Sequence, residues 1–132
     1  MPFDAMPTIT ESEAATALRL IDAVIEALGP NGERWRKGDL TSPDGKHCIM
    51  GALHYCRRKL RTPRGDRTTF FLRRAINHDL PFFHYAVSVM QFNDLKCDGF
   101  ADVRKVLLLA RELAVCAAEG RPEPPCQRPC FP

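Results

Sequence analysis

Apolar residues recur at helical spacing in several segments of this chain, and stretches containing Gly or Pro separate the segments. The clearest segment follows a capping box, in which Thr10 caps the first turn and Glu13 reaches back to Thr10. Its apolar positions are Ala14, Ala17, Leu18, Ile21, Val24, Ile25 and Leu28. Gly29 suits a left-handed C-terminal position and Pro30 cannot continue a helix. The pattern therefore predicts a helix over about residues 11–28.

Weaker patterns predict the remaining helices. A second helix starts near His47 and ends before Pro63, and a third is capped by Thr68 or Thr69. The apolar stretch over residues 82–90 favours a helix, although its Val and aromatic residues also suit a strand. We expect a loop over residues 91–99. The last helix starts at Asp98 or Asp102 and ends at Gly120.

The length of 132 residues suits one domain. We predict an all-α (mainly) fold, a compact single-domain bundle of four to five short helices with a long N-terminal loop and a Pro-rich C-terminal tail. The helical domain spans residues 1–120, with residues 1–9 as a loose arm, and the tail spans residues 121–132. Trp35 stands in a loop, where we expect its ring to pack down onto the core.

No targeting pattern precedes the first helix, and the longest apolar run, Val106 to Ala110, is too short to cross a bilayer. These features lead us to expect a cytoplasmic protein with no membrane association. The six cysteines are then expected to be reduced thiols, because the cytosol disfavours disulfides. They are Cys48, Cys56, Cys97, Cys116, Cys126 and Cys130.

Positive charge is concentrated between residues 57 and 74. This segment has eight basic residues and one acid, Asp66, so its net charge is +7, against +3 for the whole chain and −4 for the remainder. The basic residues are Arg57, Arg58, Lys59, Arg61, Arg64, Arg67, Arg73 and Arg74. Such a segment forms either a solvated face or a surface for an acidic partner. The leading hypothesis is a small interaction module that binds an acidic protein surface or a nucleic acid.

Tyr55, Phe70 and Phe71 lie close to the basic residues in sequence. An aromatic ring among arginines can stack on a nucleobase, which is the feature that would favour a nucleic acid. The alternative places Phe70 and Phe71 in the core.

Cys48 motivates an alternative function. It follows a turn and opens the second predicted helix, where backbone N–H groups and the helix dipole favour a thiolate. Lys46 and His47 would lower its pKa further. A thiol-dependent enzyme also needs a base, for which His54, His78 and His84 are candidates, and an orienting group such as Asn93 or Asp94. The structural alternatives are a buried Cys48 and an Asx turn at Asn93-Asp94.

The sequence predicts no cofactor and no metal. Nucleotide-binding and metalloprotease motifs are absent. Cys126 and Cys130, combined with His47 and Cys48 or with His54 and Cys56, do not have a standard zinc spacing. A homodimer is a further prediction, because the last helix has a wide apolar face.

Three short motifs resemble those of one protein family. They are Trp35-x-x-Gly38, Cys48-x-x-Gly51-Ala52-Leu53 and Phe92-Asn93-Asp94, followed by an amphipathic helix. This combination is similar to a family of small bacterial and phage proteins, domain of unknown function 6197, over about residues 18–117. The resemblance implies a helical domain and carries no activity with it. The Arg-rich segment and the Pro/Cys tail lie outside the shared pattern.

Overall fold

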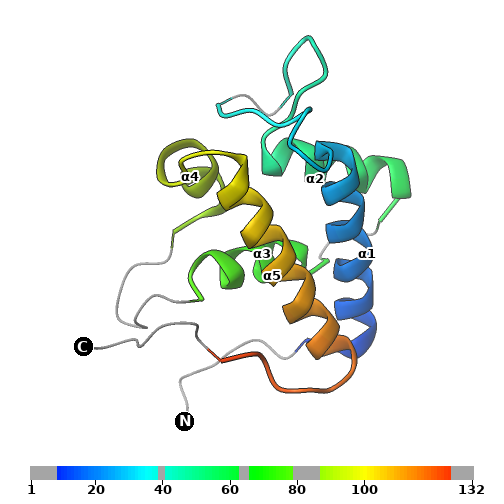
Figure 1. Cartoon of the computed structure of the whole chain (residues 1–132). Coiled ribbons are helices and arrows are strands. Elements are labelled where there is room, and N and C mark those ends of the chain that lie inside the picture. The colour runs from blue at the N-terminus through cyan, green and yellow to red at the C-terminus, as the bar shows by residue number, and fades with distance from the viewer. Residues whose placement is uncertain (1–8, 39–40, 63–65, 79–86, 126–132) are drawn as a thin grey trace, which may run out of the picture.

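The computed structural model describes residues 9–38, 41–62, 66–78 and 87–125 of the chain. Its elements are α1 (Glu11–Leu28), α2 (Ile49–Leu60), α3 (Thr68–Ile76), α4 (Val89–Gln91), the π-helix η1 (Phe92–Lys96) and α5 (Phe100–Ala118) (Figure 1). No strand is present in these ranges, where only isolated β-bridges join Trp35 and Thr41 to His47. The predicted all-α bundle of short helices is confirmed.

The two long helices, α1 and α5, run antiparallel and pack along each other (Figure 1). At one end Gly32 lies directly against the ring of Phe100, where α5 begins. At the other end Gly120, just after α5, lies beside Glu11 at the start of α1. The predicted capping box begins α1: the Glu13 N–H donates to Thr10 Oγ1 (3.1 Å) and the Thr10 N–H donates to Glu13 Oε1 (2.9 Å).

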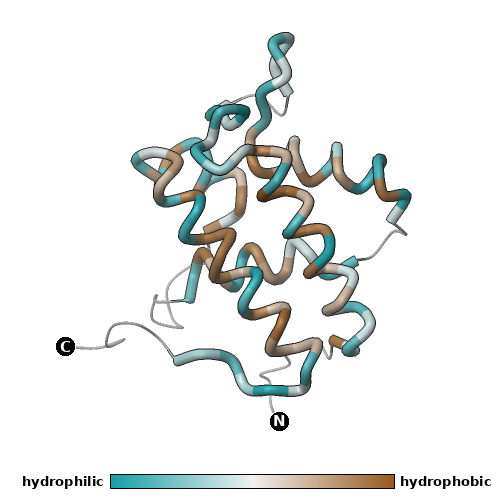
Figure 2. The backbone as a smooth tube through the Cα atoms, turned by 45° about the vertical axis from the view of Figure 1, so that its right-hand side comes forward, coloured by the Kyte–Doolittle hydropathy of each residue, from teal (hydrophilic) through white to brown (hydrophobic). Residues whose placement is uncertain are grey.

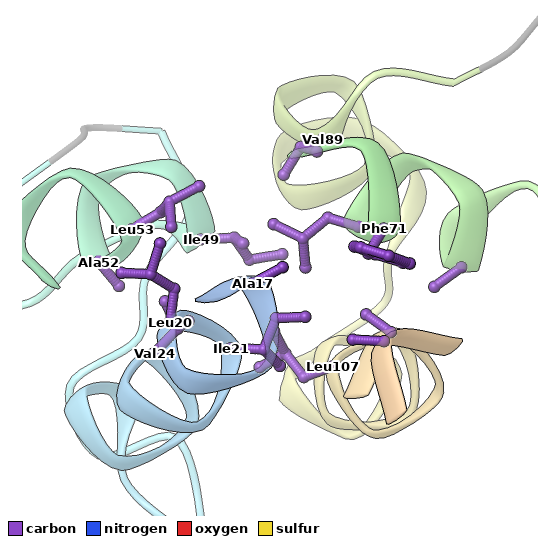
Figure 3. Close-up of a cluster of buried hydrophobic side chains, with 14 of the residues drawn as sticks. Ala17, Leu20, Ile21, Val24, Ile49, Ala52, Leu53, Phe71, Val89 and Leu107 are labelled. Carbon is purple, nitrogen blue, oxygen red and sulfur yellow. The ribbon is translucent and has the colours of Figure 1, made fainter. Parts of the chain in front are cut away.

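The core lies where α1 meets α2, α3 and α5 (Figure 3). Leu20 and Val24 of α1 lie beside Ala52 and Leu53 of α2, whereas Ile21 lies on the side of α1 toward Leu107 of α5 (Figure 3). All of these side chains are buried. Burial of each such side chain contributes roughly 1.5–3 kcal/mol, so this cluster accounts for much of the driving force for folding. Brown and teal stretches alternate along the tube of Figure 2, as expected for amphipathic helices.

The wide apolar face of α5 has two neighbours, α1 and α3. Val103, Leu107, Ala110, Leu113 and Ala114 of this face are all buried. The apolar face of α5 is wide because it packs against two helices of the same chain. A homodimer is not needed to explain this width, and it stays a prediction.

The segment after α4 differs from its prediction. A loop was expected over residues 91–99, but Gln91 ends α4 and residues 92–96 form the single-turn π-helix. The Cys97 N–H donates to the Phe92 carbonyl (3.0 Å), which is the wider turn that defines this helix. Of the predicted helix over residues 82–90, positions 82–86 lie outside the described residues, and Ser88 caps α4.

Two helix starts also differ from their predictions. Neither Thr68 nor Thr69 caps α3: the Thr68 N–H donates to Asp66 Oδ1 (3.0 Å), so the preceding carboxylate serves the first turn. The last helix begins at Phe100, after Gly99, rather than at Asp98 or Asp102. There the Asp102 carboxylate accepts from the Asp98 N–H (2.8 Å).

The described part of the tail lies against α3. Arg74 of α3 pairs with Glu123 (2.9 Å), and His78 Nε2 donates to the Pro124 carbonyl (3.0 Å). Cys126 and Cys130 lie outside the described residues. Among the described helices, none combines the length and the apolar character that a bilayer crossing requires.

Candidate functional site

Asn93 joins the three sequence motifs into one polar network. Its Oδ1 accepts hydrogen bonds from Trp35 Nε1 (2.8 Å) and from the Ile49 N–H (3.1 Å). Its Nδ2 donates to the Arg36 carbonyl (3.3 Å) and to Asp94 Oδ1 (2.9 Å). The side chain is 1% exposed. Asn93 therefore fastens the loop before α2, the start of α2 and η1 to one another.

Asp94 completes this network. Its Oδ1 accepts from the Gly38 N–H (2.9 Å) as well as from Asn93. Gly38 has a φ of +93°, a conformation that Gly adopts without the steric penalty of a side chain. Asn93 and Asp94, which we considered as orienting groups for a catalytic base, thus bind backbone N–H and C=O groups of a neighbouring loop.

Trp35 packs as the sequence predicts. Its half-buried ring lies against the core and 6.0 Å from the ring of Phe100, measured between centroids. The indole N–H is bound by Asn93, so the apolar body and the polar edge both have partners.

Cys48 occupies the N-cap of α2, where Ser, Thr, Asp or Asn is the usual residue. The Gly51 N–H donates to its Sγ (3.3 Å), and Cys48 is 1% exposed. Burial raises the pKa of this thiol and outweighs the backbone hydrogen bonds that lower it, while the Asp94 charge raises it further. The expected lowering of the Cys48 pKa is therefore wrong, because the helix N-terminus is covered.

The candidate bases do not complete a thiol site. Among the described residues, no imidazole hydrogen-bonds to Cys48, and its contact is the Gly51 N–H. His54 is half-buried on α2, and His78 binds the tail through Pro124. His84 lies outside the described residues. This geometry gives the thiol-dependent enzyme no support.

The four cysteines within the described ranges are free and buried: Cys48, Cys56, Cys97 and Cys116. Burial also raises the pKa of the Cys56 and Cys97 thiols. In those ranges no three His, Cys, Asp or Glu side chains gather closely enough to hold a metal ion.

Arg57 has a structural partner inside the protein. Its guanidinium binds Asp66 through Nε (2.8 Å to Oδ2) and through one terminal nitrogen (3.1 Å to Oδ1), and it reaches Thr69 Oγ1 (3.4 Å). The Asp66 side chain is 3% exposed. Burial raises the pKa of Asp66, but hydrogen bonds from Arg57 and Thr68 outweigh burial and hold the pKa below its ordinary value. This ion pair links the end of α2 to the start of α3.

Two further members of the basic segment pair internally. Arg67 Nε lies 3.6 Å from a carboxylate oxygen of Glu13, which ties the start of α3 to α1. Arg74 pairs with Glu123 of the tail. Arg64 lies outside the described residues. From the sequence alone, the eight basic residues are expected to form one surface. In the structure, three of them bind carboxylates of the chain itself.

The other basic residues of α2 project into solvent. Arg58, Lys59 and Arg61 are exposed, and no described acid lies within ion-pair distance of them. Lys59 Nζ lies 5.8 Å from the centroid of the Tyr55 ring, which is 39% exposed. We call Tyr55, Arg58, Lys59 and Arg61 the α2 basic surface. Arg73 is also exposed, but it stands on α3 and is not part of this surface.

His47 lies next to the α2 basic surface. Its ring centroid is 5.4 Å from that of Tyr55, and its Nδ1 hydrogen-bonds with Thr41 Oγ1 (3.0 Å). Burial lowers the pKa of His47, and the nearby charges of Arg34 and Arg58 lower it further. The sequence pattern does not indicate that His47 and Arg34 lie near the α2 basic surface, because both residues belong to the loop before α2.

The family model described as "Family of unknown function (DUF6197)" matches residues 10–113. The chain belongs to this family. The DUF6197 match runs from the N-cap of α1 to the last turns of α5, so it includes the Asn93 network and the α2 basic surface. No curated protein and no solved structure matches the chain. Membership in DUF6197 confirms the resemblance seen in the three motifs and assigns no activity.

Proposed function

We propose that this protein is a small interaction module that binds an acidic partner through the α2 basic surface. The observation that carries the proposal is the division of the basic segment. Arg57, Arg67 and Arg74 form ion pairs with carboxylates of the chain itself, whereas Arg58, Lys59 and Arg61 have no such partner among the described residues. Exposed, unpaired cations on one helix attract an acidic partner and raise its association rate.

The composition of α2 supports this assignment. Residues 49–60 contain no acid, so nothing in the helix itself offsets its positive charge. By comparison α5 also exposes basic residues, Arg104 and Lys105, but it carries Asp102 and Glu112 in the same helix. The residues of α2 therefore carry a more positive net charge than those of α5.

Arg61 gives a second line of support. It ends α2 with a φ of +52°, a left-handed conformation that disfavours residues with a Cβ and is usually taken by Gly. Stability alone would favour Gly at this position. An exposed Arg here is consistent with a role for its charge outside the fold.

A pair of charge-reversal variants tests the proposal. Fluorescence anisotropy would follow the binding of two labelled acidic probes, poly-glutamate and an oligo(dT) strand, to the whole chain. Arg58→Glu/Lys59→Glu should weaken binding of whichever probe the native protein prefers by at least about tenfold, or 1.4 kcal/mol. Arg104→Glu/Lys105→Glu on α5 changes the net charge equally and should cause a much smaller loss.

Equal losses in the two double variants would contradict the proposal, because they would report net charge rather than a surface. Circular dichroism and urea unfolding of each variant establish that the fold is intact. The cytoplasmic location and the homodimer expected from the sequence are consistent with this function, and the solution mass tests the homodimer directly.

A further inference from the structure

We infer that the partner of the α2 basic surface is an acidic polypeptide segment that presents carboxylates beside an apolar side chain. This inference rests on the proposed function and specifies the chemistry of the partner. Three observations favour a polypeptide over a nucleic acid: the apolar residues of α2 that remain exposed, the small number of free cations, and the contacts of the Tyr55 ring.

Exposed apolar groups stand among the cations of α2. Tyr55 is 39% exposed and Leu60 is 38% exposed on the same helix as Arg58, Lys59 and Arg61. Protein interfaces depend on a few Tyr, Trp and Arg side chains that contribute most of the binding energy. Tyr55 next to Arg58 provides this combination, and an apolar side chain of the partner would cover the ring.

The number of free cations suits a short acidic segment. Nucleic-acid affinity grows with the number of phosphates that basic side chains neutralise, so a surface with few free cations gains little from this contribution. Arg57, Arg67 and Arg74 already pair with Asp66, Glu13 and Glu123, whereas the cations of the α2 basic surface have no described acid as partner. Arg58, Lys59 and Arg61 match two or three carboxylates.

The spacing of these cations limits the partner further. Residues 58–61 cover about one helical turn, a rise of roughly 5 Å. The carboxylates of the partner must therefore lie close together, as they do at positions three or four apart on a helix or two apart on an extended chain.

The Tyr55 ring already has two neighbours. The His47 ring lies 5.4 Å from it with an interplanar angle of 30°, and Lys59 Nζ lies 5.8 Å from its centroid. Stacking of a nucleobase requires a whole ring face, and these two neighbours reduce the part of the Tyr55 ring that a base could cover. An apolar side chain needs only the exposed part of the ring.

Peptide and oligonucleotide probes of matched charge test the inference on the full chain. The panel consists of labelled twelve-residue peptides with four Glu and one Phe at different positions, the same peptides with Ser in place of Phe, and an oligo(dT) strand with four phosphates. At least one Phe peptide should bind about tenfold more tightly than its Ser counterpart and than the oligonucleotide. Tyr55→Ser should remove the advantage of Phe, whereas Leu108→Ser, at a 46% exposed position on α5, should leave it.

The other outcomes separate the two claims. If the oligonucleotide binds more tightly than every peptide and Arg58→Glu/Lys59→Glu abolishes this binding, the polypeptide inference is overturned and the proposed function stands. If no Phe peptide exceeds its Ser counterpart, the inference is overturned as well. If no probe binds, or if binding is unchanged in Arg58→Glu/Lys59→Glu, the proposed function and the inference both fail.

Discussion

Asn93 shows how a residue that resembles a catalytic group can be a structural one. Its amide is buried and each of its two polar atoms has two partners, of which three lie in distant segments of the chain and the fourth is the neighbouring Asp94. A buried amide saturated in this way has no capacity left to orient a base or bind a substrate. Asn93 instead determines how the loop that carries Trp35 meets the first turn of α2.

Removal of the Asn93 amide should destabilise the fold. Asn93→Ala leaves the Trp35 indole N–H and the Ile49 N–H without their acceptor, and each buried orphaned donor costs about 1–3 kcal/mol. We expect the free energy of unfolding, measured by urea denaturation, to fall by roughly 2–4 kcal/mol.

Two further variants serve as controls for Asn93. Asn93→Asp keeps an acceptor but loses the donor to Arg36 and places a second carboxylate beside Asp94, so it should also destabilise. Asn31→Ala alters an exposed Asn in the same loop region and should change stability by no more than about 0.5 kcal/mol. A similarly small change in Asn93→Ala would show that the network does not hold the loop.

Cys48 illustrates the limit of reasoning from position alone. A Cys at a helix N-terminus predicts a thiolate only when solvent reaches it, and here the loop and α2 cover the thiol. The sequence gives the helix start correctly but contains no local signal for this burial. The adjacent Ile49 N–H is bound by Asn93, which lies 45 residues beyond Cys48 in the chain.

At the scale of elements, the ion pair between Arg57 and Asp66 connects α2 to α3. It is a two-point contact with a nearly buried carboxylate, which is the geometry in which an ion pair contributes most to structure. Loss of one partner leaves the other charge partly buried. The pair therefore joins the last turn of α2 to the residue that serves the first turn of α3.

The Asp66 carboxylate makes stability depend on pH. Because its pKa is lower in the folded protein than the ordinary value of 3.8, the stabilisation is complete above that value and is lost as the pH falls through the folded pKa. Asp66→Asn should lower the free energy of unfolding by about 2–3 kcal/mol at pH 7. The difference from the native protein should shrink as the pH falls below 3.8 and through the folded pKa, and urea denaturation at pH 7 and at successively lower pH values measures it. A difference that stays the same size throughout this pH series would exclude the ion pair as its source.

The elements differ in how far they can be predicted. The first helix follows from a capping box and a regular apolar pattern, both of which are local, so its bounds of Glu11–Leu28 are predicted. The π-helix at 92–96 cannot be predicted in this way. It differs from an α-helix by about one residue per turn, and Asn93 holds it through contacts with distant segments. The cap of α3 is not predicted correctly, because Asp66 and the two Thr residues that follow it all match the residue types found at helix N-caps.

At the scale of the whole molecule, the positive charge divides into residues that pair with acids of the same chain and residues that are exposed without such a partner among the described residues. The sequence gives its total and its location, but it cannot show which arginines bind acids of the same chain, since Glu13 and Glu123 lie far from Arg67 and Arg74 in sequence. Only the packing of α1, α3 and the tail determines those pairs. Arg58, Lys59 and Arg61 of the α2 basic surface have no described acid as partner, as is also true of Arg73 on α3, and the proposed function rests on the three cations of the α2 basic surface.

The measurement that tests this account most directly is a map of the binding surface on the native protein. Backbone amide NMR spectra of the labelled chain would be recorded during titration with poly-glutamate. The account predicts salt-sensitive shift changes centred on Tyr55, Arg58, Lys59 and Arg61, extending to His47 and largely sparing Arg104 and Lys105. Changes centred on α5, or spread evenly over all exposed basic residues, would contradict the claim that α2 carries the binding surface.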